Sequence, residues 1–203
     1  EMVRRAGVIL DVIDVGGGFP APYPGMIPPP FEEYIREIQI GFDLIPVPGH
    51  CELWAEPGRA LVADAGSTLV RVEGRKDRQL YINDGTYGSL FDAGVPGFRF
   101  PVKCIRPSCE PEPDLIDFSF YGPTCDSQDA MTGPFALPID TSEGDYVEIG
   151  LTGAYGAAMR THFNGFHSDH EVVLHDQLSW LPHQKYASQA LVKPRKVAWK
   201  TFR

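Results

Sequence analysis

Hydrophobic positions follow two different rhythms along this chain, and the rhythm changes near residue 65. Before that point, Val8–Val15 is an almost continuous apolar run that ends in three glycines, which is typical of a buried parallel strand opening into a loop. Phe31–Ile38 carries apolar residues at helical spacing, and Cys51–Ala55 predicts a second strand. Strand, helix and strand in this order predict a βαβ unit.

Beyond residue 65, short apolar segments alternate with turns rich in glycine, proline and charge, which is the pattern of a mainly antiparallel sheet. The predicted strands are Thr68–Glu73, Gln79–Asn83, Phe98–Ile105, Leu115–Tyr121, Tyr146–Ile149 and Glu171–Leu174. Ala154–Arg160 has helical composition, which would place Tyr155 near a helix N-terminus; a packed aromatic is an equally good interpretation. The basic tail Lys193–Arg203 is expected to be a solvated edge or a last strand. Residues 1–65 and 66–203 are therefore predicted to form two domains.

Composition and charge narrow the classes of partner. With 43% hydrophobic and 22% charged residues among 203, the chain has an ordinary globular composition. A net charge of −9 argues against nucleic acid or an anionic membrane as partner, since both attract basic patches. No apolar run approaches the roughly 20 residues of a membrane helix. The chain opens on Glu1 and runs into a strand-like segment, so we expect the later part of a longer protein.

The four cysteines give no sign of a metal or disulfide framework. Cys51, Cys104, Cys109 and Cys125 show no CxxC spacing and no clustering with the six histidines. Free thiols are expected, together with a cytoplasmic location.

Two turns in the first region suit a ligand with a phosphate and a cationic nitrogen. Glu56-Pro57-Gly58-Arg59 sets a carboxylate and a guanidinium on one rigid turn after the second predicted strand. Gly16-Gly17-Gly18 follows the first strand, and its flexible backbone can point several N–H groups at one anion. A surface ion pair and a simple tight turn are the alternative interpretations of these two segments.

Two further turns close strands in the second region. Asp84-Gly85-Thr86-Tyr87-Gly88 follows one predicted strand, and Gly122-Pro123-Thr124-Cys125-Asp126-Ser127 follows another. A cysteine next to an aspartate on a Gly-Pro turn is presented to solvent rather than buried. This thiol and carboxylate have the chemistry to donate a proton and to bind an ammonium group.

Together the motifs resemble a known family. Asp14–Pro20, Glu56–Arg59, Asn83–Gly88, Gly122–Asp126, and Gly153–Tyr155 with Phe163–Phe166 resemble, in order and spacing, the ornithine, lysine, arginine and diaminopimelate decarboxylases. Those enzymes use pyridoxal 5'-phosphate on a β/α barrel that is followed by a β-sheet domain. The resemblance implies an α/β plus β fold: the terminal strands of a TIM-type barrel, then a mainly antiparallel sheet or β-barrel-like domain.

The resemblance also implies roles for the matched residues. By this resemblance, the residues that bind the cofactor phosphate would be Gly16, Gly17, Gly18, Gly58, Arg59 and Tyr155. Glu56 would bond the pyridine nitrogen and keep it protonated. Cys125 would reprotonate Cα after loss of CO₂, and Asp126 would bind the distal ammonium of the substrate, with Asp92 as a second ligand. Since the Cys-Asp loop comes from the neighbouring subunit in this family, a homodimer with shared active sites is implied.

The chain also departs from the family pattern. The Schiff-base lysine and the histidine that stacks on the cofactor belong to early barrel strands, and neither segment is present. Lys103 lies in the sheet region and is not assigned as that lysine. The sequence thus resembles the last barrel strands and the sheet domain, without the lysine-bearing part.

Three related functions compete with an ornithine or lysine decarboxylase. They are a catalytically silent relative that binds a regulatory partner, a diaminopimelate decarboxylase, and an amino acid racemase that protonates Cα with a tyrosine. Intact Glu56, Arg59, Cys125 and Asp126 favour an enzyme over a silent relative. Aspartate after the cysteine favours the ornithine and lysine branch, because the diaminopimelate branch has glutamate there. The sequence leaves the exact substrate open.

Overall fold

The chain falls into two units that differ in secondary structure. The computed structural model describes residues 5–174 and Trp180. The described part of the first unit, here called the βα unit, consists of residues 5–20 and Pro28–Leu61. The second, the sheet unit, consists of Ala21–Ile27 and the described residues from Val62 onwards. The predicted tail Lys193–Arg203 lies outside the described residues.

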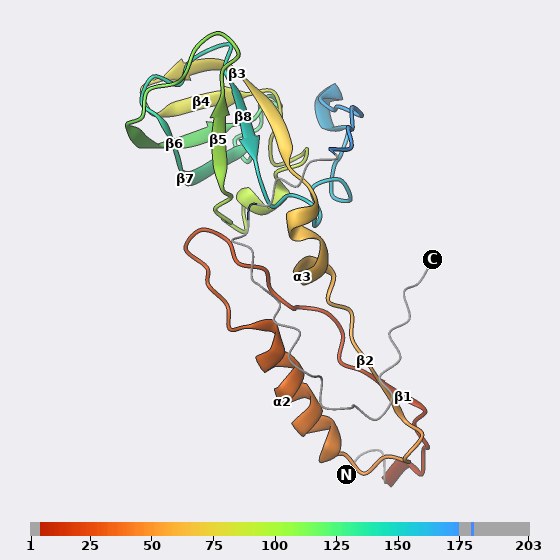
Figure 1. Cartoon of the computed structure of the whole chain (residues 1–203). Helices are drawn as coiled ribbons and strands as arrows, with labels where there is room; N and C mark the ends of the chain where they lie inside the picture. The colour runs from red at the N-terminus through yellow and green to blue at the C-terminus, as the bar shows by residue number, and fades with distance from the viewer. Residues whose placement is uncertain (1–4, 175–179, 181–203) are drawn as a thin grey trace. The chain divides into compact units, whose positions relative to one another are not determined.

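The βα unit has the strand, helix and strand order that the sequence predicts. Strand β1 (Val12–Asp14) pairs in parallel with β2 (Glu52–Trp54), and helix α2 (Phe31–Asp43) lies between them in the chain (Figure 1). The helix runs five residues beyond its predicted end at Ile38. Glutamates in its first turn interact favourably with the positive end of the helix dipole.

The packing of α2 fixes the segment that follows the glycine loop. Phe19 is only 5% exposed, and its ring lies 5.4 Å from Phe31 and 6.3 Å from Tyr34 on the helix. Both helical residues belong to the apolar face that the sequence predicts. The chain leaving the loop is therefore held against α2 by an aromatic cluster.

The prediction of a long, buried first strand is wrong in two respects. Only Val12–Asp14 of the apolar run Val8–Val15 is a strand, and Val8 and Ile9 are 54% and 71% exposed. A parallel strand is buried when other elements cover both of its faces. In the described residues β1 has a single strand neighbour, β2, so its apolar side chains remain partly exposed.

The sheet unit is a curled, mixed six-stranded sheet. Its strands are β3 (Thr68–Lys76), β4 (Gln79–Ile82), β5 (Val102–Ile105), β6 (Leu115–Tyr121), β7 (Ala130–Pro138) and β8 (Tyr146–Ile149). They lie in the order β5-β8-β3-β4-β6-β7, and every neighbouring pair is antiparallel except β4 and β6. The edge strands β5 and β7 approach each other, so the sheet closes toward a half-barrel (Figure 1).

The curled sheet encloses the main hydrophobic core. Alternate residues of its strands point inward and are almost completely buried, including Val70, Val72, Leu80, Ile82, Phe118, Phe120, Phe135, Leu137, Val147 and Ile149. The rings of Phe120 and Phe135 stack with centroids 4.1 Å apart across the β6–β7 pair. The period-2 pattern in the sequence therefore marks the inner face correctly.

In three other segments the structure differs from the elements that the sequence predicts. Strand β7 is absent from the predicted strands; its Gly133-Pro134 falls at an irregularity in the β6–β7 register, where neither residue is paired with β6, and proline is tolerated at such a place in an edge strand. Glu171–Leu174 forms no strand and is exposed. Ala154–Arg160 forms turns rather than a helix, and Tyr155 adopts a positive φ of 66°. None of the described helices has the length and apolar character needed to span a membrane.

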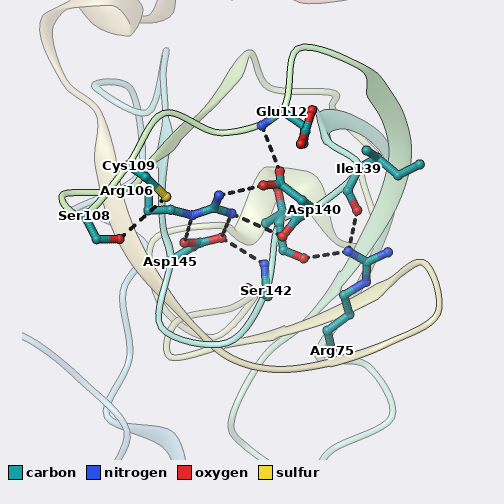
Figure 2. Close-up of polar contacts among 10 residues, drawn as sticks. Arg75, Arg106, Ser108, Cys109, Glu112, Ile139, Asp140, Ser142 and Asp145 are labelled. Carbon is teal, nitrogen blue, oxygen red and sulfur yellow. Dashed lines mark hydrogen bonds and ion pairs between the residues drawn. The ribbon is translucent and has the colours of Figure 1, made fainter.

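A partly buried ion-pair cluster, drawn in Figure 2, links the end of β5 with the turn between β7 and β8. Arg106 follows β5, and its Nε and Nη2 donate to the two carboxylate oxygens of Asp145, each at 2.7 Å. Its Nη1 donates to Asp140 Oδ2 at 2.6 Å. Arg75 adds hydrogen bonds to the carbonyls of Ile139 and Thr141 in the same turn. The cluster holds the β7–β8 turn against the end of β5.

The Arg106 guanidinium, through its hydrogen bonds, holds the pKa of both Asp140 and Asp145 below the usual range. Asp145 is only 5% exposed, so its charge depends on this partner. A carboxylate with a depressed folded-state pKa contributes its full stability above the unfolded pKa of about 3.9. That contribution is lost as the pH falls through the folded-state pKa.

We therefore predict that Arg106→Leu lowers the free energy of unfolding by about 3 kcal/mol or more at neutral pH, because it leaves Asp145 buried and unpaired. The control Arg71→Leu removes an exposed pair with Glu73 and should cost no more than about 1 kcal/mol. Urea unfolding at a series of pH values tests this. The difference in free energy of unfolding between wild type and Arg106→Leu should shrink below about pH 4. If both variants lost the same free energy of unfolding, or if the difference for Arg106→Leu grew in acid, the stabilising role of the Arg106 ion pairs would be contradicted.

Candidate active site

The glycine loop and the Glu56 turn meet at one edge of the βα unit. Because β1 and β2 are parallel neighbours, their carboxyl ends lie side by side. The Val15 N–H donates to the carbonyl of Trp54, and the Glu56 N–H donates to the carbonyl of Gly16, both at 2.9 Å. Two segments that the sequence singles out separately thus form one hydrogen-bonded surface.

The backbone of the loop needs glycine. Gly16 and Gly18 have φ values of 72° and 87°, in the left-handed region that glycine adopts without strain. A Cβ on Gly17 would lie 3.1 Å from the carbonyl oxygen of Glu56, so a side chain there would press on the turn. Asp14 Oδ1 accepts a hydrogen bond from the Gly16 N–H at 2.8 Å. Of the three glycines, Gly17 and Gly18 are then the ones whose N–H groups could donate to an anion.

The charged turn presents its carboxylate outward. Pro57 is buried and the Gly58 N–H donates to the carbonyl of Glu56 at 2.8 Å, which closes the turn. The Glu56 side chain is exposed, and Arg59 lies in the first turn of the short helix α3 (Gly58–Val62), which the sequence analysis did not predict. The Glu56 carboxylate is therefore exposed on a turn that is hydrogen-bonded to the glycine loop, and Arg59 follows it by three residues in the chain.

A second pair of turns meets in the sheet unit by the same geometry. Strands β4 and β6 are the one parallel pair of the large sheet, so the segments after Ile82 and Tyr121 emerge at the same edge. The loop that contains Asp84 and the loop that contains Cys125 thus lie next to each other. The sequence predicts each loop but not their adjacency.

The buried carboxylate of Asp129 joins these two loops. Its Oδ1 accepts hydrogen bonds from the N–H and hydroxyl of Thr86 at 2.8 and 3.1 Å. Its Oδ2 accepts from the N–H and hydroxyl of Thr124 at 3.1 and 2.6 Å. Asp129 is 2% exposed, and a Cβ on either Gly85 or Gly122 would collide with it. Glycine at both positions gives the carboxylate room to reach both loops.

Cys125 and Asp126 lie on the outer turn of the loop that Asp129 holds. The thiol is exposed, as the sequence predicts, on a residue with a φ of 61°, which is uncommon for any residue but glycine. Asp126 is partly buried; its Oδ1 accepts from the Gln128 N–H at 2.8 Å, and its Oδ2 accepts from the Tyr87 hydroxyl at 3.0 Å. The carboxylate therefore has a defined orientation next to an accessible thiol.

The Phe163–Phe166 motif completes this cluster. The Asn164 side-chain amide donates to the carbonyl of Thr124 at 2.8 Å, and the Phe163 ring stacks on Tyr87 with centroids 4.4 Å apart. Thr161 donates to the Tyr87 carbonyl through both its N–H and its hydroxyl. Two motifs that are far from it in the sequence, Asn83–Gly88 and Phe163–Phe166, thus contact the Cys125 loop or each other.

The remaining predicted residues all lie in the sheet unit. Tyr155 is 48% exposed in a turn and not at a helix N-terminus, and Asp92 lies in the 3₁₀ turn Phe91–Ala93. Lys103 is exposed on β5, opposite Glu148 in the strand register. The predicted site residues therefore fall into two groups: the glycine loop with Glu56, Gly58 and Arg59 in the βα unit, and the others in the sheet unit.

Sequence reasoning missed one residue and used two others only as parts of a motif. Asp129 looks like any turn aspartate, and only the two glycines that face it, Gly85 and Gly122, hint at its burial. Tyr87 was noted only as part of its turn, yet its hydrogen bond to Asp126 raises the pKa of the phenol. Burial likewise raises the pKa of Asp84, against the opposing effect of hydrogen bonds from Gly85 and Ser89.

Residues 10–153, which contain all but one of the predicted site residues, match the model of the pyridoxal-dependent decarboxylase family, C-terminal sheet domain. The chain belongs to this family. It is 31% identical over 186 residues to the decarboxylase flvG of Aspergillus flavus, covering 83% of this chain and 42% of that protein. It is 33% identical over 183 residues to antizyme inhibitor 2 of Xenopus laevis, covering 82% and 39%. Ornithine and diaminopimelate decarboxylases are both among its relatives.

Solved structures of the family share the fold. The lysine/ornithine decarboxylase of Vibrio vulnificus, complexed with putrescine, is 32% identical with a TM-score of 0.64, covering 81% of this chain and 44% of that one. A structure of SrLDC in complex with PLP and cadaverine is 27% identical with a TM-score of 0.65, covering 81% and 42%. This decarboxylase-family chain thus spans about two fifths of the length of these relatives.

The geometry predicts that Asp129→Asn loosens both loops of the sheet unit. An amide has one acceptor oxygen in place of two, and its NH₂ would face threonine donors, so we expect a loss of about 1–3 kcal/mol in the free energy of unfolding. Amide hydrogen exchange at Thr86 and Thr124 should accelerate. The control Asp117→Asn changes an exposed carboxylate on β6 and should leave both amides unchanged. Exchange at Thr86 and Thr124 that is the same in wild type and Asp129→Asn would refute this role.

Proposed function

We propose that this chain is the C-terminal portion of a pyridoxal-phosphate-dependent decarboxylase that converts ornithine or lysine into a diamine. The observation that carries the proposal is the Cys125-Asp126 pair, in which an accessible thiol stands beside a carboxylate of defined orientation. A thiol can supply the proton that replaces CO₂ at Cα, and a carboxylate can bind the distal ammonium of a basic amino acid. The solved relatives complexed with putrescine and cadaverine support a diamine product.

The donor set of the βα unit fits pyridoxal phosphate. Backbone N–H groups of Gly17 and Gly18 and the guanidinium of Arg59 suit a phosphate, since charge-assisted hydrogen bonds to phosphate oxygens are strong. The space beside the Cα of Gly16 and Gly18 is open, because no atom lies within 4 Å of a Cβ built there. Gly58 lets the backbone of the turn approach the ligand closely, and Tyr155 is proposed as a further phosphate donor.

Glu56 is proposed to bond the pyridine nitrogen and to hold a proton on it. The exposed carboxylate lies on a turn that is hydrogen-bonded to the glycine loop, so one ligand with both groups would satisfy loop and turn together. When bound, the cofactor supplies an electron-withdrawing ring that stabilises negative charge at the substrate Cα. The carboxylate of Glu56 keeps that ring cationic and so increases its withdrawing effect.

Cys125 and Asp126 are proposed to act on the substrate. When CO₂ leaves, the Sγ–H proton of Cys125 is transferred to Cα in its place, and the thiolate regains a proton from solvent. Asp126 binds the distal ammonium, and Asp92 is proposed as a second ligand for it. In the proposed homodimer, the Cys125 loop of one subunit completes the site of the other, as the family resemblance implies. A reducing, cytoplasmic location is part of the proposal and agrees with four free thiols.

Two other functions retain specific support. Antizyme inhibitor 2 of Xenopus laevis is among the relatives, which favours a regulatory binding protein as the second candidate. Diaminopimelate decarboxylases are also relatives, so that substrate is the third. Assay of the complete protein with ornithine, lysine and diaminopimelate separates all three: turnover of the first two supports the proposal, and absence of any turnover supports a binding protein.

In the complete enzyme, Cys125→Ala and Asp126→Ala should fail in different ways. Cys125→Ala should lower the rate of diamine formation by about 100-fold while CO₂ release continues, because the positioned proton donor is gone. Asp126→Ala should raise KM by roughly 10- to 100-fold, since the ammonium loses a charged hydrogen-bond partner. Separate assays of CO₂ and diamine measure both effects. Cys109→Ala, another exposed thiol, is the control, and an equal loss in that variant would count against a catalytic Cys125.

Subunit mixing tests the shared site. When Glu56→Ala and Cys125→Ala proteins exchange subunits at random, half of the dimers are hybrids and each hybrid has one intact site, so about a quarter of wild-type activity should return. Mixing Cys125→Ala with Asp126→Ala should restore no intact site, because both changes are in the same loop. If the first mixture stays inactive after proven exchange, the site is completed within one chain.

A further inference from the structure

We propose that Tyr87 is a positioning residue that orients the carboxylate of Asp126 toward the distal ammonium of the substrate. The inference rests on the proposed function, in which Asp126 binds that ammonium. Tyr87 precedes Asp126 by 39 residues and comes from the neighbouring loop, so the sequence gives no sign of the contact.

The Asp126 carboxylate receives one donor on each oxygen. The bond from the Gln128 N–H to Oδ1, at 2.8 Å, lies within the loop itself. By itself this bond leaves the carboxylate free to turn, because the terminal torsion of aspartate has a broad energy profile. The second bond, from the Tyr87 hydroxyl to Oδ2 at 3.0 Å, fixes the plane of the carboxylate.

Tyr87 is itself held on two sides. Its ring stacks on Phe163 with an interplanar angle of 28° and centroids 4.4 Å apart. Its carbonyl accepts two hydrogen bonds from Thr161, each at 2.9 Å. The donor to Asp126 is thus fixed by contacts that do not involve the Cys125 loop.

The arrangement leaves binding capacity for a cation. An ionised carboxylate has about four acceptor positions, and these two contacts use two of them. The phenol is a neutral donor, so the carboxylate keeps its charge for the ammonium. A phenol is protonated at neutral pH, and the hydrogen bond to Asp126 raises the pKa of Tyr87 further. Loss of the phenol would therefore weaken ammonium binding without touching the proton donor.

The first test uses steady-state kinetics of the complete enzyme with Tyr87→Phe. KM for ornithine or lysine should rise about 3- to 10-fold with kcat unchanged, because one hydrogen bond that orients the carboxylate is lost. The kcat/KM for norvaline or norleucine, which lack the distal amine, should not change. Tyr81→Phe is the matched control: Tyr81 stacks on Tyr121 at 5.5 Å on the same sheet, and its change should affect neither substrate. The proposal would be overturned if kcat/KM fell equally for both substrate classes, or if KM for the diamino acid did not change.

The second test needs no activity. In protein labelled with ¹³C at the tyrosine ζ carbon, Tyr87→Phe identifies the Tyr87 signal. That signal should titrate above the ordinary tyrosine pKa of about 10 in wild type and at a lower pH in Asp126→Asn. A wild-type signal with an ordinary pKa would overturn the contact itself. If the titration is as expected but the complete protein decarboxylates no basic amino acid, the proposed function fails, and the ammonium role with it, while the contact stands.

Discussion

The arrangement of the sheet unit's motifs depends on one buried charge. Asp129 is almost fully buried, and a buried carboxylate is stable only when donors replace the water it has lost. Two N–H groups and two hydroxyls do so, and they come from Thr86 and Thr124 on different loops. Because all four donors must converge on one side chain, the two loops cannot move independently. The thiol of Cys125 and the carboxylate of Asp126 owe their positions to this constraint.

Parallel strand pairing explains why motifs distant in sequence meet at all. In an antiparallel pair, the carboxyl ends lie at opposite edges, whereas in a parallel pair they lie at the same edge. The chain has two parallel pairs among its described strands, β1–β2 and β4–β6, and each brings together two of the turns that carry charged or reactive groups. The antiparallel pairs of the large sheet supply the core and curvature that support the second of these edges.

Local patterns predicted the elements well where a single periodicity applied. The helix at Phe31, the strands β3 to β6 and β8, and the exposed thiol of Cys125 were all predictable from neighbouring residues. Strand β7 was not, because Gly133-Pro134 is typical of a turn, and only the irregular β6–β7 register leaves both residues unpaired within an edge strand. The turn at Tyr155 was also mistaken for a helix, since its composition is helical but its φ of 66° is not.

The contacts that specify the candidate site were beyond sequence reasoning for a different reason. Asp129 and Tyr87 act through partners roughly 40 residues away, and those partners become neighbours only because β4 and β6 pair in parallel. Propensity and spacing carry no information on that pairing, which depends on how the whole sheet curls around its core.

The division of the motifs between two units has a consequence for how such a protein changes specificity. The glycine loop, Glu56 and Arg59 lie in the βα unit, while Tyr155 and the proposed substrate groups lie in the sheet unit, with Cys125 and Asp126 on one loop and Asp92 in a separate 3₁₀ turn. On the proposed function, a change at Asp126 or Tyr87 would alter the surface offered to the distal end of a substrate and would leave the glycine loop and the Glu56 turn intact. Asp129 joins the two loops through four hydrogen bonds, whereas Asp126 adds one, so a change at Asp126 leaves most of that connection in place. Relatives with different substrates can therefore share the fold, and function must be read from the side chains on this loop rather than from the fold alone.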